Sequence, residues 1–194
     1  MKHTKRLCIF NIFVFFLFFV CLSVSCYAKK AFIEDIKTKI DENALFISFR
    51  VTNCFTKKMI QAIENGVNTR FIFIVRVYEV KKWWKDKKLA DLKVIHSIYY
   101  DSIKKVYNLN LSERKGKKLV IRNLEEAKEV LSSIKNLKLI ETKRLKKGKE
   151  YQIRIKAELD KIKLPFYLHH ILFFLSLWNF KTDWYKVNFT YLSK

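Results

Sequence analysis

The sequence predicts an α+β, β-rich fold, in which an antiparallel sandwich or a strongly bent sheet is covered by two to three short helices. Apolar residues alternate with polar ones in several segments, and this period of two is typical of strands with one buried face. Short segments with one apolar helical face interrupt these strands. Because most connections are short, neighbouring strands are expected to pair antiparallel. Lipocalin-like closure of the sheet is the alternative.

Residues 1–28 have the pattern of a signal peptide or an N-terminal membrane anchor. Three basic side chains precede an uncharged run from Leu7 to Ser25, which is longer than most signal cores and approaches the length that spans a bilayer. Cleavage after Ala28 would release an exported domain, whereas retention would leave the amino terminus in the cytoplasm. Lipidation at Cys26 is a third alternative, because the residues before it loosely resemble a bacterial lipobox. All three alternatives export residues 29–194 across the inner membrane.

Residues 29–194 are expected to form a single extracytoplasmic domain, which is long enough for a sizeable core. The formal net charge of the chain is +22, and a charge of this size suggests an anionic partner such as a membrane surface. However, most of the basic residues are lysines in a chain that is also rich in Phe and Ile, and A+T-rich codons produce this composition without selection for binding. Nucleic acid is not expected as a partner, because the domain is exported.

In the first half of the domain, strands are expected over residues 32–40 and 45–52. A helix is expected to begin near Phe55, because its apolar residues share one face, and to end at Gly66. Residues 71–80 are apolar on both faces apart from two charged side chains, as expected of a central strand covered on both sides.

In the second half, a helix is expected to begin at the capping-box variant around Asn123 and to carry Ala127, Val130, Leu131 and Ile134 on one face. A third helix is expected over residues 165–177, with Pro165 in its first turn. The remaining strands are expected over residues 94–100, 106–111, 119–122, 137–142, 151–159 and 184–191.

Aromatic residues supply the candidates for a partner or membrane surface. Adjacent tryptophans lie among lysines at an expected turn, and an indole joins apolar area to a hydrogen-bond donor. Hairpin aromatics more commonly fold back onto their sheet. The helix after Pro165 is apolar nearly all round, so it is either buried in the core or an interfacial or partner-binding helix. The candidate residues are Trp83, Trp84, Phe173, Phe174, Trp178 and Trp184.

The sequence predicts no catalytic, metal-binding or cofactor-binding residue. An enzyme would require Asp101, His96 or Glu158 to converge in one cleft. The adjacent residues His169 and His170 would point about 100° apart on a helix, so they cannot share one metal ion as an i, i+4 pair does. Cys54 is the one cysteine of the domain, which excludes a disulfide within it, and a buried apolar role is expected for this residue.

The carboxyl-terminal part carries the most specific pattern. Leu159-Asp160 and Leu164-Pro165 precede the aromatic helix, and Trp178-Asn179-Phe180-Lys181-Thr182-Asp183-Trp184-Tyr185 follows it. This ending resembles that of the bacterial domain of unknown function 4390. The order of elements around Gly66, Tyr99-Tyr100-Asp101, Tyr107, Ala127, Gly148 and Tyr151 is similar too. The resemblance implies a small envelope protein of no established activity, whose gene in some members neighbours that of a membrane sensor kinase, and this suggests a signalling accessory role.

Two functions are therefore expected. The first is a non-enzymatic envelope module, either anchored in the inner membrane or periplasmic, that binds a membrane protein partner or an anionic membrane surface. The alternative is a periplasmic carrier that holds a lipid or another apolar ligand against the doubly apolar strand 71–80. Neither function requires a cofactor or a metal ion.

Overall fold

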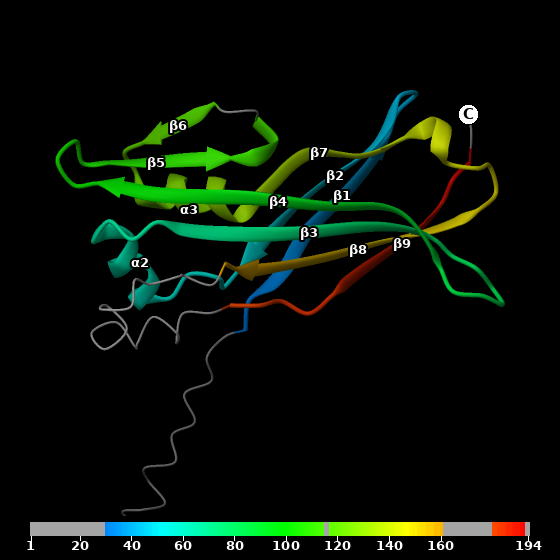
Figure 1. The fold of residues 1–194 in the computed structure, drawn as a ribbon, viewed down its shortest axis with the longest axis horizontal. Coiled ribbons are helices and arrows are strands. Elements are labelled where there is room, and N and C mark those ends of the chain that lie inside the picture. The colour runs from blue at the N-terminus through cyan, green and yellow to red at the C-terminus, as the bar shows by residue number, and fades with distance from the viewer. Residues whose placement is uncertain (1–29, 115–116, 161–179, 193–194) are drawn as a thin grey trace, which may run out of the picture.

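The computed structural model of the chain describes residues 30–114, 117–160 and 180–192, and within these ranges it consists mainly of antiparallel strands (Figure 1). The strands are β1 (Phe32–Ile40), β2 (Ala44–Thr52), β3 (Thr69–Glu79), β4 (Lys87–Asp101), β5 (Val106–Leu111), β6 (Lys118–Ile121), β7 (Ser133–Glu141), β8 (Glu150–Leu159) and β9 (Tyr185–Thr190). The helices are α2 (Lys57–Glu64) and α3 (Leu124–Ser132), with short 3-10 turns η1 (Ser112–Arg114) and η2 (Thr142–Arg144).

The strands form two antiparallel sheets, which confirms the β-rich α+β class. The smaller sheet has the order β1-β2-β7, and the larger has the order β6-β5-β4-β3-β8-β9. Over the described residues neither sheet closes on itself, so the alternative of lipocalin-like closure is wrong. The third expected helix and the leader, with Cys26, lie outside the described residues.

Strand β3 runs through the centre of the larger sheet, paired with β4 on one side and β8 on the other. Its side chains alternate between the two faces of the sheet, and those of Phe71, Phe73, Val75 and Val77 are fully buried on the inner face. The ring of Phe73 meets that of Phe49 in β2 edge-on, with 5.9 Å between centroids. The two sheets therefore share one hydrophobic core.

Both described helices begin where the sequence places them. The hydroxyl of Thr56 accepts a hydrogen bond from the Met59 amide at 3.2 Å, and the side-chain oxygen of Asn123 accepts one from the Glu126 amide at 3.1 Å. These contacts satisfy amides that the first helical turn leaves without partners.

The end of α3 differs from the prediction. Ile134 was expected on the helix, but α3 ends at Ser132 and β7 begins directly at Ser133. The hydroxyl of Ser132 donates to the Lys128 carbonyl at 2.8 Å, a local contact that competes with helix continuation. Ile134 then pairs with Phe49 in the smaller sheet and is buried there. Sheet pairing thus outweighs the helical periodicity of the sequence.

Strand β4 also differs from the prediction, because it begins at Lys87 and not at residue 94. Its first half carries charged residues on one face and small or partly exposed residues on the other, which hides the period of two. The strand forms there because β3 supplies a pairing partner as far as Glu79, with one register shift between Val77 and Tyr78.

A buried histidine links β4 to α3 and η1. The ring of His96 is fully buried, with Nδ1 3.1 Å from the Leu131 carbonyl oxygen and Nε2 2.9 Å from Oε1 of Glu113. Because a carbonyl oxygen only accepts, Nδ1 carries a hydrogen, and Nε2 faces the carboxylate of Glu113. Burial raises the pKa of Glu113, but the hydrogen bond and the charge of His96 outweigh it and hold this pKa below its ordinary value of 4.5.

This pair predicts an acid-sensitive contribution to stability. Because the pKa of Glu113 is lower in the folded state, the contribution is complete above about pH 4.5 and is lost as the pH falls through the folded-state pKa. Glu113→Gln should remove this pH dependence and lower the free energy of unfolding at neutral pH by about 1–2 kcal/mol. Urea unfolding followed at several pH values measures both effects. The exposed control Glu42→Gln should keep the wild-type pH profile, and an unchanged profile in Glu113→Gln would contradict the assignment.

Candidate functional site

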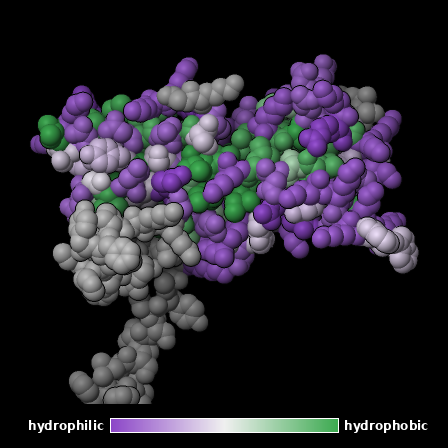
Figure 2. Space-filling model, in the orientation of Figure 1, coloured by the Kyte–Doolittle hydropathy of each residue, from purple (hydrophilic) through white to green (hydrophobic). Residues whose placement is uncertain are grey.

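The tip of the β3–β4 hairpin, residues 80–86, projects from the body of the molecule at the right of Figure 2. The β3–β4 ladder continues to the pair Glu79 and Lys87, so the tip begins directly where the sheet ends. Trp83 and Trp84 lie in it with 94% and 84% of their surfaces exposed. Both were predicted as surface residues, and they are more exposed than Trp184, the other tryptophan among the described residues.

The structure shows why these indoles do not fold back onto the sheet. On the outer face of the sheet, next to the tip, the guanidinium of Arg154 lies over the ring of Tyr78 at 4.1 Å. Arg154 also donates to Oδ2 of Asp86 at 2.5 Å. The other carboxylate oxygen of Asp86 accepts from the Lys81 amide at 3.4 Å. The aromatic surface nearest to the tip is thus covered, and both ends of the tip are fixed to the sheet.

The tip is positively charged after its ion pairs are taken into account. Lys81 pairs with Glu79 at 3.2 Å, and Asp86 is neutralised by Arg154. The other exposed lysines of this region are Lys82, Lys85 and Lys87. No described residue forms an ion pair with any of the three. Three free cations therefore surround two exposed indoles.

Trp184 lies elsewhere on the larger sheet. It is 38% exposed, with the guanidinium of Arg76 5.0 Å and the ammonium of Lys156 5.7 Å from its ring centre. Its neighbour Tyr185 pairs with Ile155 in the middle of β8, several residues from the tip. The structure thus does not bring Trp184 to the tip, and the predicted surface residues Phe173, Phe174 and Trp178 lie outside the described residues.

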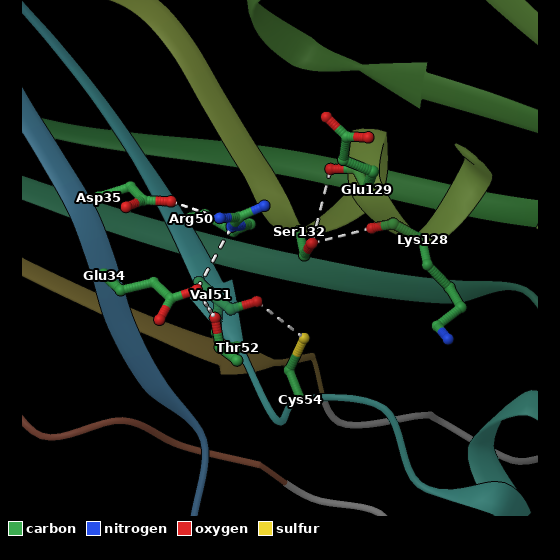
Figure 3. A network of polar contacts seen from close by, with 9 residues as sticks. All are labelled: Glu34, Asp35, Arg50, Val51, Thr52, Cys54, Lys128, Glu129 and Ser132. Carbon is green, nitrogen blue, oxygen red and sulfur yellow. Dashed lines mark hydrogen bonds and ion pairs between the residues drawn. The ribbon is translucent and has the colours of Figure 1, made fainter. Parts of the chain in front are cut away.

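A second region with many polar side chains is an open groove of about 790 Å³ between the smaller sheet and α3 (Figure 3). Arg50 pairs there with Glu34 at 3.4 Å and with Asp35, and the Thr52 hydroxyl donates to Glu34 at 2.5 Å. These groups satisfy one another and cross-link β1 to β2. We therefore assign them a structural role.

Cys54 lies beside this groove but is buried, and its thiol contacts the Val51 carbonyl oxygen at 3.4 Å. Burial raises the pKa of the Cys54 thiol to about 12, so the thiol stays protonated at neutral pH. The prediction of a buried apolar role for this residue is confirmed.

The residues that an enzyme would require do not meet. His96 points into the core, whereas Asp101 ends β4 and accepts hydrogen bonds from the amides of Ile103 and Lys104. Glu158 pairs with Lys156 at 2.7 Å on β8. Over the described ranges no three His, Cys, Asp or Glu side chains are placed to share a metal ion. No helix in this described part of the chain has the length and apolar character needed to cross a membrane.

The clamp formed by Tyr78, Asp86 and Arg154 was missed by the sequence analysis. Asp86 and Arg154 are 68 positions apart, and they meet because β8 pairs with β3 in a particular register. The run of lysines around the tryptophans is visible in the sequence, but the Asp86–Arg154 contact that joins the tip to β8 has no local signal.

The clamp predicts that Asp86→Asn loosens the tip without unfolding the domain. The Asp86–Arg154 side chains are about one quarter exposed, and loss of such a pair should cost about 1 kcal/mol or less of global stability. Amide hydrogen exchange in residues 80–87 should accelerate by about threefold or more. The matched change Asp160→Asn removes a partly exposed pair with Arg70 near the other end of β3 and should leave exchange at the tip unchanged. Equal effects of the two changes would contradict the clamp.

The burial of Cys54 predicts that its thiol resists alkylation. Iodoacetamide reacts with thiolates, and a thiol with a pKa of about 12 has almost none at neutral pH. Peptide mapping by mass spectrometry should find Cys54 unmodified in the folded protein and modified after denaturation in urea. Rapid labelling of the folded protein would show that this residue is accessible and reactive.

One comparison with known proteins gives a match. The family model described as a domain of unknown function, DUF4390, matches residues 28–188, which is most of the chain. Searches of curated proteins and of solved structures return no match. The matched range includes β1 to β8 and the tip between β3 and β4, and it ends within β9, two residues before the end of that strand. The family expected from the two-tryptophan ending is confirmed, and the chain belongs to the DUF4390 family.

Proposed function

We propose that the protein is a non-enzymatic accessory module of the bacterial envelope that docks onto a membrane component through the tip of its β3–β4 hairpin. The leader exports the domain and leaves it anchored in the inner membrane or free in the periplasm. The docking target is a membrane protein, such as a sensor kinase, or the membrane surface. The exposure of Trp83 and Trp84 on a clamped tip is the observation that carries this proposal.

The energetic argument rests on the apolar area of the two indoles. A tryptophan contributes about 150–250 Å² on burial, and apolar burial is worth about 25 cal/mol per Å². Two indoles that leave water together would thus supply several kcal/mol, from which the costs of association are subtracted. The clamp lowers those costs, because the tip is ordered before it meets its target.

The rest of the domain is suited to act as a rigid support for this tip. In this proposal the two sheets pack as a sandwich whose core holds the long β3–β4 hairpin in place. The outer end of the hairpin is then a fixed recognition element, and the sheets have no chemical role.

The carrier alternative gains no support from the described residues. The inner side chains of β3, which would line a ligand cavity, are fully buried, and the ring of Phe73 packs on that of Phe49 in the smaller sheet. The groove between the smaller sheet and α3 opens to solvent and is lined largely by charged side chains. We therefore retain docking as the proposed function.

Site-specific photo-crosslinking in the native host tests the proposal. A photoreactive residue that replaces Trp84 should form an adduct with an envelope component, either a protein or a lipid. The matched position is Ile103, which is 92% exposed at the opposite end of β4, about 46 Å away. No adduct should form there, and equal adducts at both positions or none at position 84 would contradict docking by the tip.

The double variant Trp83→Ala/Trp84→Ala should lose this docking while its fold is kept. Because both side chains are almost fully exposed, the free energy of unfolding should change by about 0.5 kcal/mol or less. Crosslinking from a photoreactive residue placed at Lys82 should fall by about tenfold. The control variant Ile103→Ala should crosslink like the wild type. Normal crosslinking in the double variant would exclude the indoles as the docking groups.

A further inference from the structure

We infer that the target of the tip is an anionic lipid surface, and that Trp83 and Trp84 insert into its interfacial layer while the neighbouring lysines contact lipid phosphates. This inference rests on the proposed docking function and names its target. Four features of the described residues support it: the shape of the tip, its charge, its rigidity and its distance from the start of the domain.

The tip is a projection and not a groove. The two indoles lie beyond the end of a two-stranded ladder that stops at Glu79 and Lys87, and 94% and 84% of their surfaces are exposed. A projecting apolar group needs a pocket in a protein partner, whereas a bilayer interface accepts it without one. Indoles suit the headgroup level because their rings are apolar and their N–H groups remain hydrogen-bonded.

The charge of the tip complements an anionic surface. Both carboxylates of the region, Glu79 and Asp86, are engaged by cations of the protein itself. The lysines at positions 82, 85 and 87 are exposed, and no described residue forms an ion pair with them. A lysine close to an anionic membrane surface contributes about 1 kcal/mol. The lysines would therefore select anionic over zwitterionic lipid.

The tip is also ordered before it binds. Arg154 contacts both Tyr78 and Asp86, so it holds the carboxyl-terminal end of the tip against the outer face of the sheet. Asp86 in turn accepts from the Lys81 amide near the other end. Insertion then immobilises few additional backbone angles, which leaves more of the indole burial as net binding free energy.

The start of the described domain lies within reach of the same membrane. Lys30 pairs with Asp183 at 2.7 Å, and the neighbouring Thr182 amide donates to the Ala157 carbonyl. Ala157 pairs with Phe73 of β3, six residues before the end of that strand, which is about 20 Å along the strand. A domain attached through its leader would thus hold the tip near the bilayer at high effective concentration, where weak insertion is sufficient.

The emission of the tip indoles tests this inference in the full-length chain reconstituted in vesicles. The difference in fluorescence between the wild type and Trp83→Phe/Trp84→Phe isolates the two indoles from the other tryptophans. One set of vesicles contains phosphatidylglycerol and brominated phosphatidylcholine, and the other contains phosphatidylcholine and the same brominated lipid. Bromine quenches only indoles that enter the bilayer. Quenching by about twofold or more is expected in the anionic vesicles, with little in the zwitterionic ones.

Matched charge variants test the part played by the lysines. Lys82→Gln/Lys85→Gln/Lys87→Gln should abolish the quenching in anionic vesicles. The control triple variant removes the same charge from exposed lysines away from the tip, on α2 and in the β4–β5 turn, and should quench like the wild type. Its changes are Lys57→Gln, Lys58→Gln and Lys104→Gln. Equal quenching in both lipids, or equal losses in both triple variants, would overturn the selection of anionic lipid by the tip.

The absence of quenching in both kinds of vesicle would overturn the lipid target. The crosslinking at position 84 would then test the docking function separately. A discrete protein adduct at this position would leave docking by the tip in place, with a protein as its target. Failure of quenching together with failure of the adduct would remove both the lipid target and the proposed function.

Discussion

The pairing of β3 with β4 and β8 is the constraint on which the rest of the structure depends. It places Phe71, Phe73, Val75 and Val77 on the inner face, where all four are fully buried. A shift of one residue would move these side chains to the outer face and bring Arg76 into the core. Burial of a stack of large apolar side chains therefore fixes a single register for the three central strands.

The same register determines the geometry of the tip. Because β8 is held in place by its pairs with β3, Arg154 lies opposite Arg76 and close to Tyr78 on the outer face. From this position it reaches Asp86 beyond the end of the ladder. Packing of the core thus determines a feature of the surface. It sets the position of Arg154, whose guanidinium covers the Tyr78 ring and binds Asp86 at the end of the tip.

The sequence predicts the strands of this fold well, because each strand with one buried face keeps its period of two. It fails where pairing and local periodicity disagree. Ile134 fits the helical stripe of α3, but its burial against Phe49 in the sheet is decided by a strand about 85 residues earlier. The contacts of His96 with Leu131 and Glu113, and of Asp86 with Arg154, are long-range in the same sense. No local pattern encodes such contacts.

Lysine-rich charge does not by itself distinguish the tip, because the chain has 40 basic and 18 acidic residues, so more than half of the basic residues cannot each have an acidic partner of their own. The β4–β5 turn shows this directly: it combines an exposed Ile103 with Lys104 and Lys105, yet it carries one apolar side chain and no aromatic ring. The tip differs because two indoles are exposed beside each other, while Arg154 covers the Tyr78 ring on the adjacent sheet and fixes the end of the tip through Asp86. Folding alone does not require this arrangement, since the core is complete without either indole. The physical argument for a function therefore rests on the combination of exposed indoles, free lysines and an ordered tip, and not on net charge.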